Sequence, residues 1–167
     1  MARPRLIETP VEQRDGEVLV WTDGACRRNP GPGGWAAIVV PCDGGDAVEL
    51  TGSAPHTTNN RMEYTAALEG LRALPDGSRA CIVTDSRLML DSMTKWITGW
   101  KRRGWRTAGG DPVKNQDLVV ALEAEIARHS QVRWHWVRGH ETGEAHAHKA
   151  LNDRADRLAV AASQAAA

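Results

Sequence analysis

The sequence predicts an α/β fold whose single sheet mixes antiparallel and parallel strands. Three strand-like segments, at residues 18–23, 35–40 and 47–53, are separated by short turns that contain glycine, proline and aspartate. Turns of this length favour an antiparallel meander. Further along, an apolar strand at 80–84 is followed by a helical pattern and then by an alternating strand at 132–137. That order requires a parallel crossover.

The composition is that of one domain without a strong overall charge. The chain has 167 residues with 21 basic and 21 acidic side chains, so any site for a polyanion must come from local clustering. Three cysteines, with no pair at a metal-ligand spacing, indicate a reduced, cytoplasmic protein. The first sixteen residues contain no apolar stretch long enough to predict a signal peptide, and no apolar run in the sequence is long enough to cross a membrane. We expect a soluble monomer with no obligate protein partner, made of a flexible leader (1–16) and a single domain (17–165).

The first hairpin is built around residues 18–35, VLVWTDGACRRNPGPGGW. The apolar run ends at Thr22 and Asp23, and segment 29–34 predicts a tight reversal, because proline fixes φ while glycine supplies positive φ. Asp23 is therefore expected at the mouth of an apolar strand. The alternative role for Asp23 is that of a turn aspartate that bonds its own backbone.

Two further acids occupy comparable places. Glu63 lies in the first turn of a helix predicted at 59–74, where it could instead close a capping box with Asn60 and favour the helix dipole. Asp85 follows the buried strand at 80–84, at the end of a parallel strand where ligands bind in α/β sheets. Its alternative role is the N-cap of the helix that begins at Ser86.

Residues 95–114 form the one strongly basic segment. The segment contains six basic residues and one acidic residue, and three tryptophans lie among them. The glycine-broken run KRRGWR (101–106) predicts a protrusion that holds phosphates and stacks on a sugar or base. The alternatives are a solvated run of charge and, for Trp96 and Trp100, packing along one helix face.

The last third of the chain predicts a helix at 116–130, the strand at 132–137, a polar loop at 141–149 and a final helix at 151–162. The final helix presents Asp153 and Asp156 on one face, because residues three apart are neighbours on a helix.

Six segments occur together in the order found in one known family. They are TDGACRRNPGPGGW, TTNNRMEYTAALEGL, VTDS, KRRGWRTAGGDPVKNQDL, VRGH and NDRADRLA. On these segments the chain resembles a type 1 ribonuclease H of the bacterial kind. The resemblance implies a five-stranded sheet in the order 3-2-1-4-5, flanked by helices. It also implies endonucleolytic, Mg²⁺-dependent hydrolysis of the RNA strand of RNA/DNA hybrids, leaving 5′-phosphate and 3′-hydroxyl ends.

The resemblance also implies roles for individual residues. The four catalytic and metal-binding acids correspond to Asp23, Glu63, Asp85 and Asp156, and the catalytic loop histidine corresponds to His140. Contacts with the hybrid are implied for a set of polar, basic and aromatic residues: Cys26, Asn29, Thr58, Asn59, Asn60, Trp96, Lys101, Arg102, Arg103, Trp105 and Arg106. Trp96 is expected near a deoxyribose of the DNA strand.

These roles fit the chemistry of phosphodiester hydrolysis. Two Mg²⁺ ions roughly 4 Å apart, which Mn²⁺ could replace, activate the nucleophile and relieve charge on the leaving oxygen, and hard cations prefer carboxylate ligands. We expect Asp23 to bridge the ions, Glu63 and Asp85 to hold one of them, and Asp156 to hold the other. His140 would move a proton, since an imidazole titrates near neutral pH. Asparagine side chains would read 2′-hydroxyl groups in a wide minor groove, so cleavage should not depend on base sequence.

The chain departs from the family pattern between His140 and Asp156, where fifteen residues intervene. His146 and His148 in this longer loop could share the role of His140, and Asp153 is the alternative fourth acid. Two other functions remain open. One is a hybrid-binding module without catalysis, and the other is an integrase-like DNA nuclease of the same fold.

Overall fold

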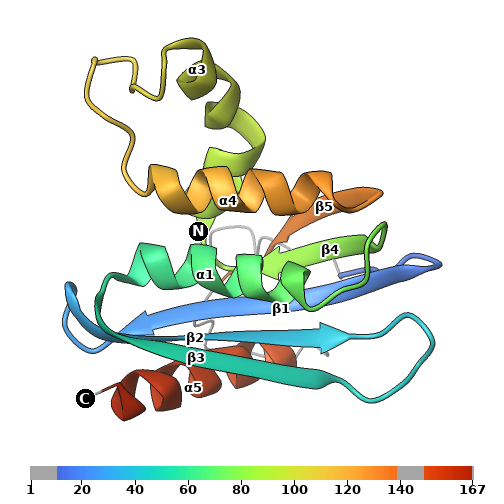
Figure 1. The fold of residues 1–167 in the computed structure, drawn as a ribbon. Helices are drawn as coiled ribbons and strands as arrows, with labels where there is room; N and C mark the ends of the chain where they lie inside the picture. The colour runs from blue at the N-terminus through green and yellow to red at the C-terminus, as the bar shows by residue number, and fades with distance from the viewer. Residues whose placement is uncertain (1–10, 139–148, 167) are drawn as a thin grey trace, which may run out of the picture.

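The computed structural model describes residues 11–138 and 149–166, and within them it confirms the predicted five-stranded mixed sheet. The strand order is β3-β2-β1-β4-β5 (Figure 1). The strands are β1 (Glu17–Cys26), β2 (Gly31–Val40), β3 (Val48–Thr57), β4 (Arg79–Thr84) and β5 (Gln131–Trp136).

The pairing of β1 changes direction across the sheet. β1 runs antiparallel to β2 and parallel to β4, and β5 runs parallel to β4 on the other side. The parallel pairing of β1 with β4 ends at Thr22 opposite Thr84. Asp23, within β1, and Asp85, just after β4, are therefore the next residues beyond the last position at which these two strands pair.

The hairpin strands are longer than predicted. We expected the first strand to end at Asp23, but β1 continues to Cys26, and β2 begins at Gly31 instead of Trp35. The glycines join the strand because neighbouring elements pack against them closely. A Cβ atom on Gly34 would lie 2.4 Å from the carbonyl oxygen of Ala159 in the last helix. β3 is likewise extended, to Thr57.

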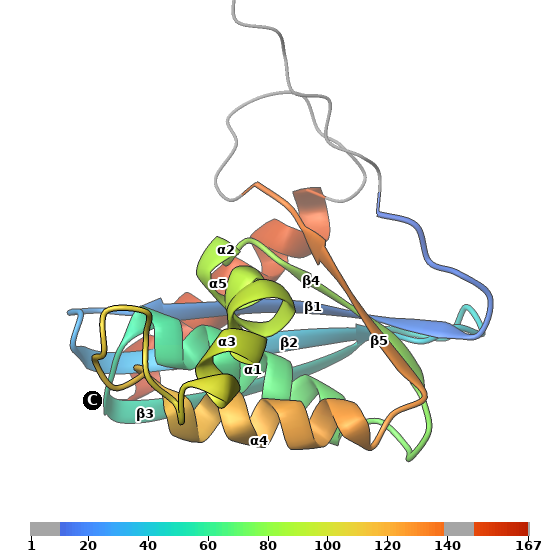
Figure 2. The same cartoon turned by 90° about the horizontal axis from the view of Figure 1, so that it is seen from above.

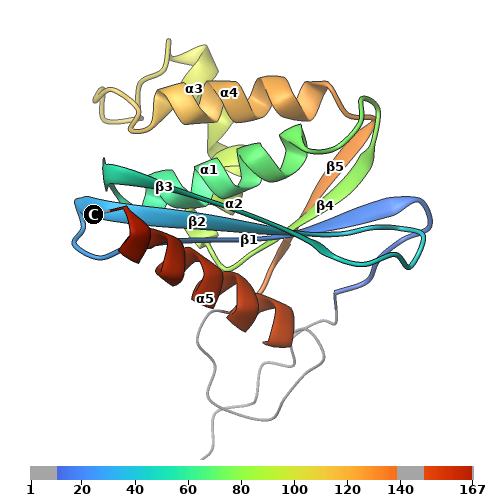
Figure 3. The same cartoon turned by 60° about the horizontal axis from the view of Figure 1, so that its bottom comes forward.

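Helices cover both faces of the sheet. On one face lie α1 (Asn59–Arg72) and α4 (Gln116–Ala127), and α5 (Lys149–Ala165) crosses the other face (Figures 1 and 3). Each side has its own apolar core. The core under α1 and α4 includes Leu71 and Ile82, and the core under α5 includes Trp21 and Val83. No helix in the described ranges is long and apolar enough to span a membrane.

The connection from β4 to α4 is a separate feature. Helix α2 (Arg87–Asp91) continues through a π-helical segment, η1 (Ser92–Trp96), into α3 (Ile97–Arg102). The chain then loops back to α4, with positive φ at Gly104, Trp105, Gly110 and Asn115. We call residues 101–115 the basic protrusion, and Figure 1 shows its loop beyond α4, away from the sheet.

Residues just before β1 lie against the sheet. Val11 is buried in the core under α5, and the amide of Gln13 donates to the carbonyls of Val40 and Pro41 at 3.2 and 3.1 Å. Arg133 on β5 donates to the carbonyl of Glu12 at 2.6 Å, which joins this segment to the far strand of the sheet. The division into a leader and a domain at residue 17 stays a prediction.

Candidate active site

Three carboxylates from three different elements converge beyond the end of β4. Asp23 of β1, Glu63 of α1 and Asp85 after β4 each offer an oxygen, and these oxygens all lie within 4.8 Å of one another. Asp23 is 3% exposed and Glu63 is 8% exposed, whereas Asp85 is half-buried. The structure therefore brings together three of the four predicted acids at one buried point.

A close approach of two backbones sets the distance between Asp23 and Glu63. A Cβ atom on Gly24 would lie 2.6 Å from the backbone nitrogen of Glu63 and 2.7 Å from Cβ of Met62. Only glycine therefore lets β1 pass so near α1. The backbone N–H of Gly24 also donates to Oδ1 of Asp23 at 2.8 Å, which fixes the direction of that carboxylate.

The capping alternatives are not what the structure shows. Thr58 caps α1, with its hydroxyl accepting from the backbone N–H of Arg61 at 3.2 Å, and Glu63 lies in the second turn. Ser86 caps α2 by accepting from the backbone N–H of Met89 at 3.2 Å. Thr58 and Ser86, and not Glu63 and Asp85, therefore cap these two helices. Asp23 bonds its neighbouring backbone but lies within a strand and not in a turn.

Burial and mutual repulsion perturb the titration of this cluster. Burial, followed by the negative charge of Asp85, raises the pKa of Asp23 to about 7. Burial and the charges of Asp23 and Asp85 raise the pKa of Glu63 well above its usual range. The hydrogen bond between Glu63 and Asp23 lowers the pKa of Asp23 and raises the pKa of Glu63.

The cluster has the chemistry of a site for a hard cation. Its donors are all carboxylate oxygens, which Mg²⁺ and Mn²⁺ prefer. Oε2 of Glu63 is buried without a hydrogen-bond partner among residues 11–138 and 149–166, a costly state that a bound cation would relieve. The residues present therefore fit a divalent metal.

The fourth acid lies next to this group. Asp156 on α5 is half-buried, and its negative charge also raises the pKa of Asp23. It is not one of the three acids whose oxygens lie within 4.8 Å of one another. Among the acids of α5, Asp156 is the one whose charge is among the causes of the raised pKa of Asp23, which favours it over Asp153 as the fourth acid. The predicted histidines His140, His146 and His148 lie outside the described residues.

The polar residues predicted to contact RNA gather where the first hairpin meets α1. The amide oxygen of Asn29 accepts from the backbone N–H of Asn59 at 3.2 Å, which joins the hairpin loop to the helix start. The thiol of Cys26 donates to the carbonyls of Arg28 at 2.8 Å and Thr57 at 3.5 Å. Thr58 is half-buried, and Asn59 and Asn60 are exposed beside it. These residues thus lie together where the first hairpin meets the start of α1, the helix that also carries Glu63.

The basic protrusion presents its cations unequally. Lys101 pairs with Glu123 of α4 at 3.1 Å, and Arg103 and Arg106 donate to backbone carbonyls of the protrusion at 3.2 and 2.9 Å. Arg102 is exposed and has no such partner in the described ranges. The protrusion thus uses some of its basic side chains to hold its own shape.

The three tryptophans of this region differ as well. Trp96 is 42% exposed, and its ring centroid lies 6.0 Å from that of Trp100. Trp100 packs against the core under α1 and α4. Trp105 also packs against that core, with a φ of 65°, so it supports the protrusion from within. Contact of Trp96 and Trp105 with a nucleic acid stays a prediction.

The structure adds one residue near the site that the sequence pattern did not suggest. The indole N–H of Trp136, at the end of β5, donates to the backbone carbonyl of Asp85 at 3.1 Å. The guanidinium of Arg87 lies over the same ring, 5.6 Å from its centroid. The predicted strand at 132–137 includes Trp136, but the bond from Trp136 to Asp85 depends on the register between β4 and β5.

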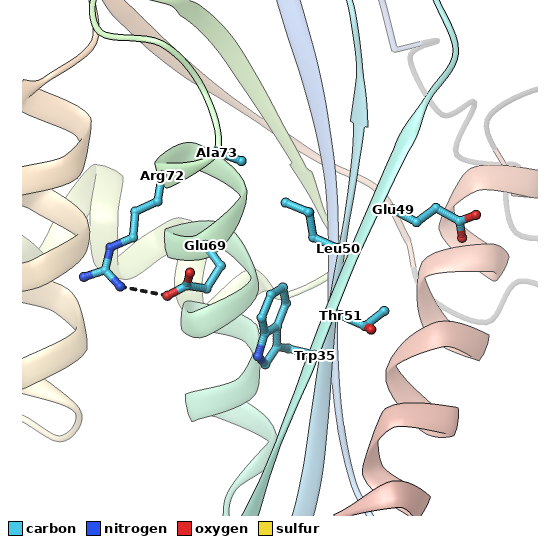
Figure 4. Close-up of a pocket in the computed structure, with 7 residues that line it drawn as sticks. All are labelled: Trp35, Glu49, Leu50, Thr51, Glu69, Arg72 and Ala73. Carbon is cyan, nitrogen blue, oxygen red and sulfur yellow. Dashed lines mark hydrogen bonds and ion pairs between the residues drawn. The ribbon is translucent and has the colours of Figure 1, made fainter.

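An open pocket elsewhere in the molecule is not part of this cluster. It lies between β3 and the C-terminal half of α1, and Trp35 and Leu50 point into it (Figure 4). Glu69 and Arg72, which form an ion pair at 2.7 Å, line its edge. Glu63 is at the opposite end of α1, so the pocket and the carboxylates are separate features.

Known proteins of one family resemble this chain along most of its length. The family model described as RNase H matches residues 15–164. A protein named Ribonuclease H from Halorhodospira halophila is 53% identical over 148 residues, which are 89% of this chain and 93% of that protein. Another Ribonuclease H, from Alkalilimnicola ehrlichii, is 54% identical over 145 residues, or 85% and 91% of the two chains.

Solved structures agree with these relatives. The crystal structure of LC9-RNase H1, described as a type 1 RNase H with the type 2 active-site motif, has a TM-score of 0.74 and 32% identity to this chain. The match covers 94% of this chain and 76% of that one. The carboxylates of Asp23, Glu63 and Asp85 thus lie in a chain whose fold and whose sequence both match one family. The chain is a member of the ribonuclease H family.

Proposed function

We propose that this protein is an endonuclease that hydrolyses the RNA strand of RNA/DNA hybrids with the help of divalent metal ions. The observation that carries the proposal is the buried convergence of Asp23, Glu63 and Asp85 within 4.8 Å. It occurs in a chain whose relatives at about half identity are named Ribonuclease H. Hydrolysis would leave 5′-phosphate and 3′-hydroxyl ends.

The metal site is proposed to hold two Mg²⁺ ions, which Mn²⁺ can replace. Asp23, at the centre of the cluster, would face both ions, with Glu63 and Asp85 on one side and Asp156 on the other. The raised pKa values of Asp23 and Glu63 support this arrangement, because carboxyl groups that repel one another are those that a bound cation stabilises. Bound ions supply an activated water and stabilise the negative charge that develops on the phosphate.

The residues of the chain prepare the site in three ways. Gly24 and Trp136 hold Asp23 and Asp85 in place through hydrogen bonds. Burial of Asp23 and Glu63 keeps most water away from these two carboxylates, which strengthens their interaction with nearby charges. His140 is proposed to move a proton to the leaving oxygen or the product, a role that rests on the family resemblance.

The substrate is proposed to span two surfaces. The RNA strand would lie along Cys26, Asn29 and residues 58–60, whose amides and hydroxyl can contact 2′-hydroxyl groups in a wide minor groove. The DNA strand would lie against Trp96 and the basic protrusion, which contacts its phosphates. None of these contacts reads a base edge, so cleavage is expected to be independent of sequence.

A single comparison tests the proposal. A labelled RNA/DNA hybrid is incubated with the protein in Mg²⁺ and in EDTA, beside single-stranded RNA, duplex RNA and duplex DNA. We expect loss of the RNA strand of the hybrid alone, and only with Mg²⁺. Binding of the hybrid without cleavage would indicate a non-catalytic module, and equal cutting of duplex DNA would indicate an integrase-like nuclease.

Two further properties belong to this proposal. We place the protein in the cytoplasm as a monomer, in line with the reduced cysteines expected from the sequence. We also place the catalytic domain at residues 17–165; Val11 and Gln13 before it pack against the sheet.

A further inference from the structure

Arg61 and Asp117 form a bidentate ion pair between the N-terminal turns of α1 and α4. Nη1 and Nη2 of Arg61 donate to Oδ1 and Oδ2 of Asp117 at 3.0 and 2.8 Å, and Nη1 also donates to Oδ1 of Asn115 at 3.3 Å. Hydrogen bonding within the pair raises the pKa of Arg61 and lowers the pKa of Asp117. Both groups therefore keep their charges throughout the neutral pH range.

This pair connects the two surfaces that the proposed substrate would span. Arg61 lies between Asn60 and Glu63, so it belongs to the turn that carries both a predicted RNA contact and a catalytic carboxylate. Asp117 lies in the first turn of α4, directly after the basic protrusion. Figure 1 shows the N-terminal ends of α1 and α4 on the same side of the molecule, where the protrusion returns to the fold.

The attachment point is conformationally defined. Asn115 ends the protrusion in a left-handed conformation, with a φ of 59°, and its carbonyl accepts the backbone N–H groups of Leu118 and Val119, both at 3.0 Å. Arg61 bonds this residue and the helix that follows it. The three hydrogen bonds of the planar guanidinium fix an orientation as well as a distance.

The pair is poorly placed to stabilise the fold. The side chains of Arg61 and Asp117 are 36% and 66% exposed, and ion pairs this accessible to water contribute little to the free energy of unfolding. A rigid, exposed bidentate contact between two binding surfaces is better explained by the geometry that it maintains.

We propose that Arg61 and Asp117 are positioning residues that hold the basic protrusion in register with the catalytic carboxylates, so that one hybrid contacts both. The inference rests on the proposed function, since it assigns a role within that same substrate site. Arg61 acts through Asp117 and does not itself bind the substrate. Loss of the pair then weakens binding of the hybrid, while chemistry on a bound hybrid continues.

The test compares Arg61→Ala, Asp117→Ala and the double variant with the wild type in steady-state cleavage of an RNA/DNA hybrid. We expect each single variant to raise KM by roughly three- to tenfold, with kcat within about twofold, and the double variant to match the singles, because residues of one contact are not additive. Arg72→Ala is the matched control. It removes an ion pair with Glu69 at 2.7 Å on the same helix, remote from the protrusion, and should leave KM unchanged.

Asp117→Ala distinguishes this proposal from the alternative that Arg61 binds a phosphate of the hybrid directly. In that case, removing Asp117 would free the guanidinium of Arg61, and KM would fall or stay the same. That result, additive effects of the two variants, or an unchanged KM in both would overturn the proposal. Arg61→Lys keeps the charge but loses the fork, so it should also raise KM, and melting temperatures show that each variant is folded. If the wild type does not cleave the hybrid, the proposed function is wrong. If the wild type cleaves it and the variants have the same KM as the wild type, only this inference is wrong.

Discussion

Asp23 holds its carboxyl group where water is nearly excluded and where two other carboxyl groups face it. Burial and the charge of Asp85 raise the pKa of Asp23 to about 7, and burial together with the charges of Asp23 and Asp85 raises the pKa of Glu63 beside it. A catalytic site of this kind is strained until a cation enters, because each deprotonated oxygen repels its neighbours. The residue is therefore expected to contribute to activity and to lower the stability of the metal-free protein.

Replacing Asp23 with asparagine tests both effects. We expect Asp23→Asn to abolish cleavage, to leave binding of the hybrid within a few-fold, and to raise the melting temperature in EDTA at pH 7.5 by a few degrees. In a domain of this size about 1 kcal/mol corresponds to roughly 2–4 °C. Thermal unfolding by circular dichroism measures the shift, with Asp153→Asn as a control on α5. A lower melting temperature in Asp23→Asn would argue against close repulsion in the cluster.

The same cluster predicts how stability depends on pH. The folded-state pKa of Asp23 is raised from its ordinary value near 4 to about 7. The native protein therefore holds a proton that the unfolded chain has lost, and stability that is present below about pH 4 is lost as the pH rises toward 7. The melting temperature of the wild type minus that of Asp23→Asn, both in EDTA, should become more negative between pH 5 and pH 8. A difference that stays constant would contradict the raised pKa.

Sequence reasoning placed the individual acids better than their partners. Asp23 and Asp85 could be predicted at one edge of the sheet because each follows an apolar strand, and Glu63 because its helix opens beside that sheet. Sequence alone left capping as an alternative for Glu63 and Asp85, since Thr58 and Ser86 offered no stronger signal. The bond from Trp136 to Asp85 could not be predicted, because it depends on strand register and not on spacing along the chain.

The basic protrusion shows that a run of charge is not a uniform surface. Lys101 is neutralised by Glu123, and Arg103 and Arg106 bond the loop backbone, whereas Arg102 is exposed. These differences depend on which acceptors the folded loop and α4 bring within reach of each cation. The sequence predicted the protrusion but could not rank its cations.

This ranking predicts unequal effects of substitution. Arg102→Ala should weaken binding of the hybrid and reduce the slope of log affinity against log salt by about one counterion, because a free guanidinium is the one available to a phosphate. Lys101→Ala should change the slope less, since Glu123 already pairs with its charge. Fluorescence anisotropy in a salt series, in the absence of metal, measures both slopes. Equal slopes for Arg102→Ala and the wild type would remove Arg102 from the binding surface.

The sequence predicted which helices and strands exist more closely than it predicted where each of them begins and ends. The helix predicted at 116–130 ends at Ala127, and the one predicted at 151–162 runs from Lys149 to Ala165. Glycine and proline in the first hairpin indicated a long turn. The close packing of α5 on Gly34 instead draws those residues into β2. Tertiary contacts of this kind decide where a strand begins, and local sequence does not record them.

The molecule as a whole is organised by the change of direction at β1. Antiparallel pairing on one side and parallel pairing on the other bring Asp23 of β1 beside the end of β4, with α1 on one face of the sheet and α5 on the other (Figure 2). At the opposite end of the sheet, Arg133 forms a bidentate ion pair with the buried Glu17 at 2.7 Å and also holds the carbonyl of Glu12. Hydrogen bonds from Arg133 and from the backbone of Arg14 outweigh burial and lower the pKa of Glu17.

These contacts predict the effect of shortening the chain. A protein that begins at residue 17 loses buried Val11 and the backbone partner of Arg133, so its free energy of unfolding should fall by about 1–3 kcal/mol while it remains folded. A protein that begins at residue 11 is the matched control, because it keeps Val11 and Glu12, and it should be the more stable of the two shortened proteins. Urea unfolding measures both. Equal stability of the two shortened proteins would support a domain that begins at residue 17 without help from the preceding segment.

Crystals of the protein soaked in Mn²⁺ and measured at the manganese absorption edge test the central assignment most directly. We predict anomalous density between the carboxylates of Asp23, Glu63 and Asp85, and none there in crystals of Asp23→Asn. Occupied manganese elsewhere, with no density among these three carboxylates, would contradict the proposed metal-dependent active site.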